Sequence, residues 1–440
     1  MSLLDEHGNP YSGGNRDALA SWERAVAAYQ TYNDNAVPLV DAALEADPDF
    51  VMGHCFHAAT GLSGTDKAGL VEVRKRMERL GDLAPKANDR ERGHIAGIAA
   101  WASGDWKKAA ACWGAVLESF PRDAFALHIV HTLDFYLGDP RILRDRIARV
   151  LPHWDATVPG HSHVVGMHAF GLEESGDYPR AEERGLYAVE QDPRDAWAVH
   201  AVAHVYEMEG RSEDGIAWLD RTWRDWIDGV FAVHNAWHKA LLHADRGEHD
   251  VALAIYDDVL FRPETDFVQE LLDAASLLWR LDLSGTDTGE RWQALAPHWR
   301  RRTGDGNYAF NDMHTMMAMV ATGDELGQAD LLKTMEAVAQ AEGTNAMMTR
   351  RVGLPVCRGL QAFGRRRFDD AVRHMAPVRY DTHLFGGSHA QRDVIALTLM
   401  EAALACEDMV LARTLAAERA ALKPSSPANR RFLARAGLAH

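Results

Sequence analysis

The sequence predicts an all-α protein, an α-solenoid of roughly ten to eleven helical hairpins stacked along the chain. Three observations lead to this fold class. Apolar residues recur with the 3.6-residue spacing of helices, for example over 141–150 and 330–341, while alternating strand-like runs are scarce. Glycines followed by an acidic or basic residue recur at a nearly constant interval. A proline follows several of the segments that we expect to be second helices of a hairpin.

The recurring glycines mark the expected turns between the two helices of each hairpin. By subtraction, the central members of the series are 34, 38, 34 and 37 residues apart. An alanine often stands five residues after the glycine, where a small side chain lets the second helix pack closely. The central members are Gly104, Gly138, Gly176, Gly210 and Gly247; weaker members are Gly64, Gly285, Gly323, Gly364 and the segment Cys406–Asp408.

The end of each hairpin is marked by a proline, at Pro121, Pro193 and Pro263, where a helix has to stop. A hairpin cannot bury its own apolar face, so neighbours must stack into a continuous core. A period of about 34 residues is that of tetratricopeptide repeats (TPR), which implies a TPR-like right-handed α-solenoid. We expect one continuous array over 16–422, a flexible N-terminus over 1–15 and a C-terminal tail over 423–440.

Composition excludes several classes of function. The 440 residues include 47 Lys and Arg against 64 Asp and Glu, a net charge of −17, which argues against a nucleic acid or an anionic membrane as partner. The chain has no secretory signal and no long apolar run, and its four cysteines form no CxxC motif, so we expect a cytoplasmic protein. The common signatures of nucleotide-binding proteins, serine hydrolases and zinc proteases are missing, and no motif implies a cofactor.

Histidine is unusually frequent, with 22 residues. The position of each residue relative to the turn glycine of its predicted hairpin, which we call the repeat frame, shows where many of them fall. In TPR proteins the first helix of each hairpin lines the concave face of the superhelix. Eight histidines occupy such positions, and His314 is a ninth. The eight are His54, His94, His128, His163, His200, His204, His234 and His238.

The spacing of the central histidines is typical of a binding or catalytic site. His200 and His204 are four residues apart, Glu207 continues the same helical face, and His234 and His238 repeat the spacing in the next hairpin. Three interpretations remain open. The four imidazoles could hold a divalent metal ion; they could perform metal-free acid–base chemistry; or they could be hydrogen-bonded polar groups of the core.

Several strings resemble the tetratricopeptide repeat protein 38 family over almost the whole chain. They are FVMGH at 50–54, DAWAVHAVAHVYEM at 195–208, HNAWH at 234–238, FNDMH at 310–314, VGLP at 352–355 and GGSHAQRD at 386–393. The resemblance implies an all-helical superhelix but no particular reaction. It also implies family-typical polar residues at His54, His131, His200, His204, Glu207, His234, Asn235, His238, Asp312, His314, Arg392 and Asp393.

We therefore expect a central pocket that binds, and transforms by hydrolase- or lyase-type chemistry, a small polar molecule. The expected catalytic residues are His200, His204, Glu207, His234, His238, Asp312 and His314. The expected substrate-binding residues are His54, His131, Trp197, Asn235, Arg392 and Asp393, with Arg392 holding an anionic group. If a metal takes part, its ligands are His200, His204, His234 and His238.

The alternative is a non-enzymatic TPR scaffold that binds a peptide or another protein. Scaffolds that clamp acidic C-termini usually offer Lys and Arg in the groove. The groove expected here offers His, Trp and Glu, which weakens that version of the alternative.

Overall fold

A computed structural model describes residues 3–32 and 36–438, and it confirms the expected fold class: the chain is all-α and consists of TPR-like helical hairpins. The chain divides into two compact units. The first contains residues 1–202 and 222–232, and the second contains residues 203–221 and 233–440. Among the described residues, no helix has the length and apolar character that crossing a membrane requires.

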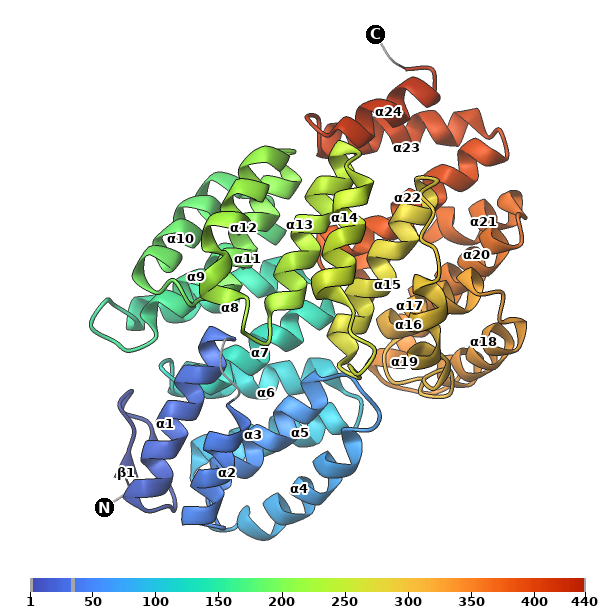
Figure 1. Ribbon diagram of the computed structural model, residues 1–440. Helices are drawn as coiled ribbons and strands as arrows, with labels where there is room; N and C mark the ends of the chain where they lie inside the picture. Colours follow the sequence, from blue (N-terminus) through green and yellow to red (C-terminus); the bar gives the residue numbers. More distant parts are fainter. Residues whose placement is uncertain (1–2, 33–35, 439–440) are drawn as a thin grey trace. The chain divides into compact units, whose positions relative to one another are not determined.

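The first unit begins with a short antiparallel strand pair, β1 (Leu3–Leu4) and β2 (Pro10–Tyr11), followed by helical hairpins. In each hairpin the two helices pack against each other, as α9 and α10 do side by side in Figure 1. The helices are α1 (Arg16–Thr31), α2 (Val37–Ala46), α3 (Val51–Ser63), α4 (Leu70–Leu83), α5 (Asp89–Ala102), α6 (Trp106–Ser119), α7 (Ala124–Leu137), α8 (Pro140–Val150), α9 (His161–Glu174) and α10 (Tyr178–Gln191).

Three helices contribute to both units: α11 (Ala196–Met208), α12 (Ser212–Trp226) and α13 (Ala232–Arg246). The rest of the second unit is again made of helices packed on their neighbours in sequence. They are α14 (His249–Ile255), α15 (Val268–Leu283), α16 (Arg291–Arg300), α17 (Ala309–Ala321), α18 (Glu325–Ala339), α19 (Thr344–Met348), α20 (Leu354–Gly364), α21 (Phe368–Met375), α22 (His389–Ala405), α23 (Met409–Leu422) and α24 (Pro427–Arg435).

The glycine frame predicts the turns correctly. All seven glycines from Gly104 to Gly323 in the series lie between the helices of a hairpin with φ between 67° and 87°, a region that favours glycine. Two of the weaker members, Gly64 and Gly364, behave differently, because a residue one or two positions after the glycine turns the chain. Thr65 has φ of 53° next to Gly64, and Arg366 has φ of 58° near Gly364.

The two ends that we expect to be looser both contain regular structure. Tyr11 in β2 is buried, and helix α24 forms within the expected tail. The side chain of Lys423, at the start of that tail, is 13% exposed and forms an ion pair with Glu207 in α11. The continuity of one array through both units stays a prediction.

Close packing inside a hairpin can be tested at two helical glycines of the first unit. A Cβ added to Gly97 in α5 would lie 2.9 Å from ring carbons of Trp113 in α6, whereas a Cβ on Gly81 in α4 would meet nothing within 4 Å. We expect Gly97→Ala to lower the free energy of unfolding by about 1–3 kcal/mol through overpacking. Gly81→Ala should raise it by about 0.5 kcal/mol through helix propensity. Urea unfolding followed by circular dichroism measures both, and equal midpoints would contradict this packing.

Candidate functional site

The histidines of the first unit lie on first helices, as the repeat frame predicts, but they have separate partners. His94 in α5 is fully buried and places Nε2 2.8 Å from an Asp123 oxygen, while Trp113 donates its indole N–H to Nδ1 at 3.1 Å. Since Nδ1 accepts, Nε2 carries the proton and donates to Asp123. Arg90 completes this network with a 2.9 Å ion pair to the same carboxylate. This histidine is a paired polar group of the core.

His54 and His163 have local partners of their own. The Nε2 atom of His54 lies 2.9 Å from the carbonyl oxygen of Pro48. His163 lies 3.1 Å from Asp195 and 3.5 Å from Asp192. Burial lowers the pKa of His163, but the two carboxylates outweigh burial and raise it to about 9. These contacts hold helix ends and neighbouring helices together.

His131, Trp197 and His200 belong to an aromatic cluster of the first unit. The His200 ring lies 5.0 Å from that of Trp197 and 5.1 Å from that of Phe170, measured between centroids. His131 lies 5.5 Å from Trp197, and burial lowers the pKa of His131 to about 3. His131 is therefore neutral at physiological pH, and ring packing dominates its surroundings.

The second unit brings together three of the four expected central histidines: His204 from α11, and His234 and His238 from α13. Each offers a ring nitrogen, and these nitrogens lie within 4.8 Å of one another. The ring centroids of His204 and His238 are 4.3 Å apart, and those of His234 and His238 are 5.0 Å apart. We call these three residues the histidine triad. His204 and His238 are fully buried, and the side chain of His234 is 14% exposed.

Two carboxylates accept hydrogen bonds from the Nδ1 atoms of two residues of this triad. Glu207 Oε2 lies 3.0 Å from Nδ1 of His238, and both oxygens of Asp273 in α15 lie within 3.0 Å of Nδ1 of His234. Because a carboxylate can only accept, each Nδ1 carries the proton and donates it. The lone pair of both rings is then on Nε2.

Glu207 connects the triad to a lysine. Its second oxygen, Oε1, accepts a 2.9 Å bond from the ammonium of Lys423. Burial raises the pKa of Glu207, but Lys423 and His204 outweigh burial and hold it below its usual value. Burial, followed by the neighbouring histidines, lowers the pKa of His238 well below its usual value. At neutral pH the unit therefore holds a carboxylate between an ammonium and a neutral imidazole.

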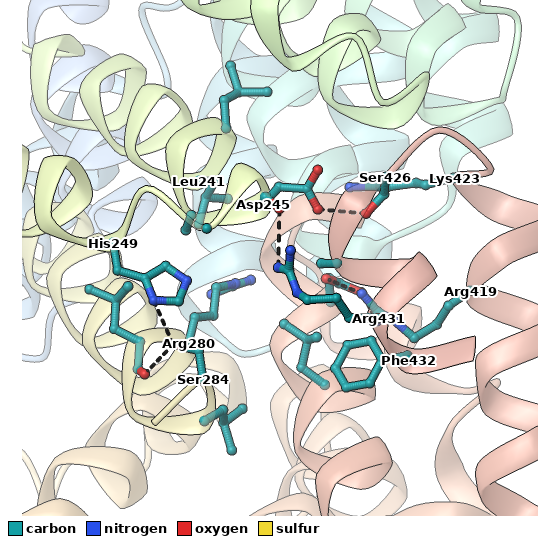
Figure 2. Close-up of a pocket in the computed structure, with 18 of the residues that line it drawn as sticks. Leu241, Asp245, His249, Arg280, Ser284, Arg419, Lys423, Ser426, Arg431 and Phe432 are labelled. Atoms are coloured by element: carbon teal, nitrogen blue, oxygen red, sulfur yellow. Dashed lines mark hydrogen bonds and ion pairs between the residues drawn. The ribbon is translucent and has the colours of Figure 1, made fainter. Parts of the chain in front are cut away.

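A cavity of about 690 Å³ in the second unit begins where Glu207 and Lys423 meet. Figure 2 shows Arg280 from α15, Arg419 from α23, Lys423 directly after α23 and Arg431 from α24 reaching toward the same space. Two of its five Arg and Lys side chains are fully neutralised by acids in the wall: Arg419 by both oxygens of Asp393, and Arg435 by both oxygens of Glu401. The remaining walls include Leu241, Leu242, Leu281, Leu283, Leu397 and Phe432.

Arg280 is the exception among the buried charges of this cavity. It is 9% exposed, and its guanidinium donates to neutral groups: the Ser276 hydroxyl and carbonyl, and the Ala390 carbonyl at 2.6 Å. No acidic side chain among the described residues lies within 4.0 Å of it. Burial lowers its pKa to about 10, and the face of the Trp237 ring lies 5.4 Å away. Arg431 also lacks an ion pair there and donates to the backbone oxygen of Asp245.

Asp312 and His314 do not join the triad through any bond that the structure shows. His314 turns its Nδ1 toward the carbonyl oxygen of Phe310, 2.9 Å away in the preceding turn of α17. Asp312 lies two residues from His314, so the two side chains leave the helix on different faces. The Oδ2 atom of Asp312 is buried and has no hydrogen-bond partner among the described residues. Burial, followed by Asp305, raises the pKa of Asp312 to about 8.

Arg392 lies outside the cavity, and its expected role in holding an anion stays a prediction. Arg392 donates to the Gly387 carbonyl and lies 3.4 Å from His389, and it is not part of the cavity wall. Its neighbour Asp393 pairs with Arg419 from α23. Asn235 is fully buried beside His234 in α13.

Sequence reasoning missed three residues of the site: Asp273, Arg280 and Lys423. A signal for two of them is present, because Asp273 and Arg280 are charged residues within the mostly apolar segment 268–283 and lie two helical turns apart. Lys423 has no such signal, since it is 216 residues from Glu207.

No family model matches this sequence. Among solved structures, the chain is similar to the crystal structure of yeast Tom70, with 13% identity over 96% of this chain and 88% of that chain, and a TM-score of 0.32. It is also similar to the structure of Naa15/Naa10 bound to HypK-THB, with 13% identity over 96% of this chain and 68% of that chain, and a TM-score of 0.26. TM-scores this low do not establish a shared fold. The fold assignment therefore depends on the helical hairpins of the chain itself. Membership of the tetratricopeptide repeat protein 38 family stays a prediction.

The raised pKa of Asp312 predicts a pH-dependent cost to stability. Between about pH 4 and pH 8 the unfolded chain releases the Asp312 proton while the folded chain keeps it, so rising pH favours unfolding. We expect the free energy of unfolding of Asp312→Asn to exceed that of the parent protein. The difference should grow from pH 5 to pH 8, by at most about 1.4 kcal/mol per pH unit. Urea unfolding of both proteins at each pH gives this difference, and a constant difference would refute the assignment.

Proposed function

We propose that the chain is a non-enzymatic helical scaffold that binds an acidic peptide segment in the cavity of the second unit. The observation that supports this most is Arg280, a buried guanidinium that lines the cavity and has neutral hydrogen-bond partners. Asp393 and Glu207 act on its charge without contacting it, and a carboxylate in direct contact would remove much of the cost of burying this charge. Arginine is also suited to bind a carboxylate through two parallel hydrogen bonds.

The position of Arg431 supports the same ligand. It lines the cavity together with Arg280, and neither forms an ion pair among the described residues. Their positive charges are therefore available to an anion that enters. By contrast, Arg419 and Arg435 have bidentate carboxylate partners and serve to shape the wall.

The rest of the wall favours a peptide over a simple anion. Leucines and Phe432 supply apolar surface beside the cations, which suits a segment that mixes acidic and apolar side chains. The volume of about 690 Å³ is that of a site for a drug-sized molecule or a few residues of peptide. The Arg and Lys side chains of this cavity set it apart from the groove expected from the sequence, which offers His, Trp and Glu.

A second candidate function is acid–base chemistry on a small polar molecule. The specific observation that favours it is the pair of His–carboxylate contacts, His238 with Glu207 and His234 with Asp273. A carboxylate that fixes the proton on Nδ1 prepares Nε2 to accept a proton from a substrate. Under this candidate His204, His234 and His238 are the catalytic residues, and the catalytic roles expected for His200, Glu207, Asp312 and His314 stay predictions.

We place the protein in the cytoplasm as part of the same proposal. The cysteines Cys55, Cys112, Cys357 and Cys406 are all free thiols. Unpaired cysteines are typical of reducing compartments.

The peptide proposal is tested with a fluorescein-labelled hexapeptide of alternating Glu and Leu and with its Gln–Leu counterpart. We expect fluorescence anisotropy to show binding of the Glu peptide only, and Arg280→Met to weaken it at least tenfold, because Met keeps the volume but removes the charge. Arg358→Met is the control, since Arg358 is 42% exposed, pairs with Glu336 and lies outside the cavity wall. Equal binding of the two peptides, or unchanged binding by Arg280→Met, would refute the proposal.

The second candidate makes a separate prediction about turnover. His238→Asn keeps a donor where Nδ1 meets Glu207 but removes Nε2. If the triad is catalytic, a polar metabolite extract incubated in ¹⁸O-water should lose a compound with the parent protein and not with His238→Asn, as followed by mass spectrometry. A hydrolase would place ¹⁸O in its product, whereas an eliminating lyase would not. Identical extracts after both incubations would contradict this candidate.

A further inference from the structure

We propose that the histidine triad, His204, His234 and His238, is a binding site for one Zn²⁺ ion. This inference goes beyond the proposed peptide binding and does not depend on it. The three residues come from two helices and bring one ring nitrogen each within 4.8 Å of the other two. Nitrogens bound to one tetrahedral Zn²⁺ lie about 3.4 Å apart, so side-chain rotations that move the rings by about an ångström close the site.

The carboxylates on the triad support a metal more than an ordinary polar core. Histidines that bind metals usually donate the other ring N–H to a carboxylate or carbonyl, which fixes the tautomer and raises the basicity of the ligand nitrogen. Both histidines of α13 have this arrangement through the same atom, with Nδ1 of His234 on Asp273 and Nδ1 of His238 on Glu207.

A buried histidine of the first unit provides the contrast. His94 bonds Asp123 through Nε2 and Trp113 through Nδ1, so both of its nitrogens take part in a local hydrogen-bond network. In the triad the imidazoles instead face one another, with His204 and His238 only 4.3 Å apart between centroids.

Two carboxylates lie beside the imidazoles of the triad. Asp273 is 2% exposed, and its ion-pair partner among the described residues is His234 alone. Glu207 is shared between His238 and Lys423. Lys423 and Arg280 supply the positive charges that act on these carboxylates, and Asp273 has no direct contact with either of them.

The donor set selects the class of metal. Imidazole nitrogen suits Zn²⁺ and its neighbours among the late transition metals, whereas Mg²⁺ and Ca²⁺ prefer oxygen ligands. Three neutral histidines around Zn²⁺ leave one coordination position for water or another ligand. Glu207 contacts His238 and also lines the cavity of the second unit. The triad and the cavity are therefore adjacent.

The test uses the full chain, without an affinity tag, after treatment with EDTA and removal of the chelator. Isothermal titration with ZnCl₂ should show one site per chain, and CoCl₂ should give the visible absorption bands of tetrahedral Co²⁺ with nitrogen ligands. Zn²⁺ at a hundred times its Kd should also raise the free energy of unfolding by about 2.7 kcal/mol. Absence of stoichiometric Zn²⁺ and Co²⁺ binding by the folded parent protein would overturn the proposal.

Matched variants locate the ion. His234→Asn and His238→Asn retain a donor to Asp273 or Glu207 but lose the Nε2 ligand, and each should weaken Zn²⁺ binding at least a hundredfold. Asp273→Asn keeps all three imidazoles and should weaken binding by about tenfold to a hundredfold. His298→Asn is the control, because His298 pairs with Asp266 through Nδ1 at 3.2 Å and lies outside the triad.

The parent titration keeps the test decisive even if a variant folds poorly, and circular dichroism identifies such a variant. Zn²⁺ binding that is equally strong in the parent, in His234→Asn and in His238→Asn, all of them folded, would place the ion elsewhere and overturn the proposal. Loss of peptide binding in Arg280→Met with intact Zn²⁺ binding would separate this inference from the proposed function.

Discussion

The main constraint on this protein is that a helical hairpin cannot bury its own apolar face. Each first helix is therefore enclosed by its partner and by neighbouring hairpins, and polar side chains on it lose contact with water. Helix α15 shows the consequence: Asp273 and Arg280 are charged residues in a mostly apolar helix, and both are buried. A buried charge is costly unless another group compensates it, so the partners of these side chains determine the chemistry of the second unit.

The buried polar groups fall into two kinds. The network of Arg90, Asp123 and His94 is closed in charge, because its charged groups pair with each other inside the core. Arg280 and Asp312 are different, since Arg280 has only neutral partners and Asp312 has an oxygen without one among the described residues. A closed network stabilises one conformation. A buried group whose charge or hydrogen bond is not compensated instead favours binding of a ligand or a proton that compensates it.

The sequence predicts the fold better than the site, and the reason is the range of the interactions. Turn glycines act locally, through the backbone conformation of one residue, so Gly104 and Gly138 identify their hairpins correctly. The spacing of His204 and Glu207 is also local, and it predicts that they share a helical face. Other contacts are not local. Asp273, the partner of His234, is on another helix, and Lys423, the partner of Glu207, follows α23 far along the chain, so only packing decides which side chains meet.

The two hydrogen bonds of Glu207 link the cavity to the imidazoles. One carboxylate accepts from both Lys423 and His238, so the cavity and the imidazoles share a single group. An anion that attracts the ammonium of Lys423 leaves more of the negative charge of Glu207 to His238 and makes that ring more basic. Thermodynamic linkage then requires reciprocity: whatever factor an occupant of the cavity applies to affinity at the imidazoles, an occupant there applies to the cavity. Occupancy of the proposed peptide site and of the proposed metal site would thus be coupled through one side chain.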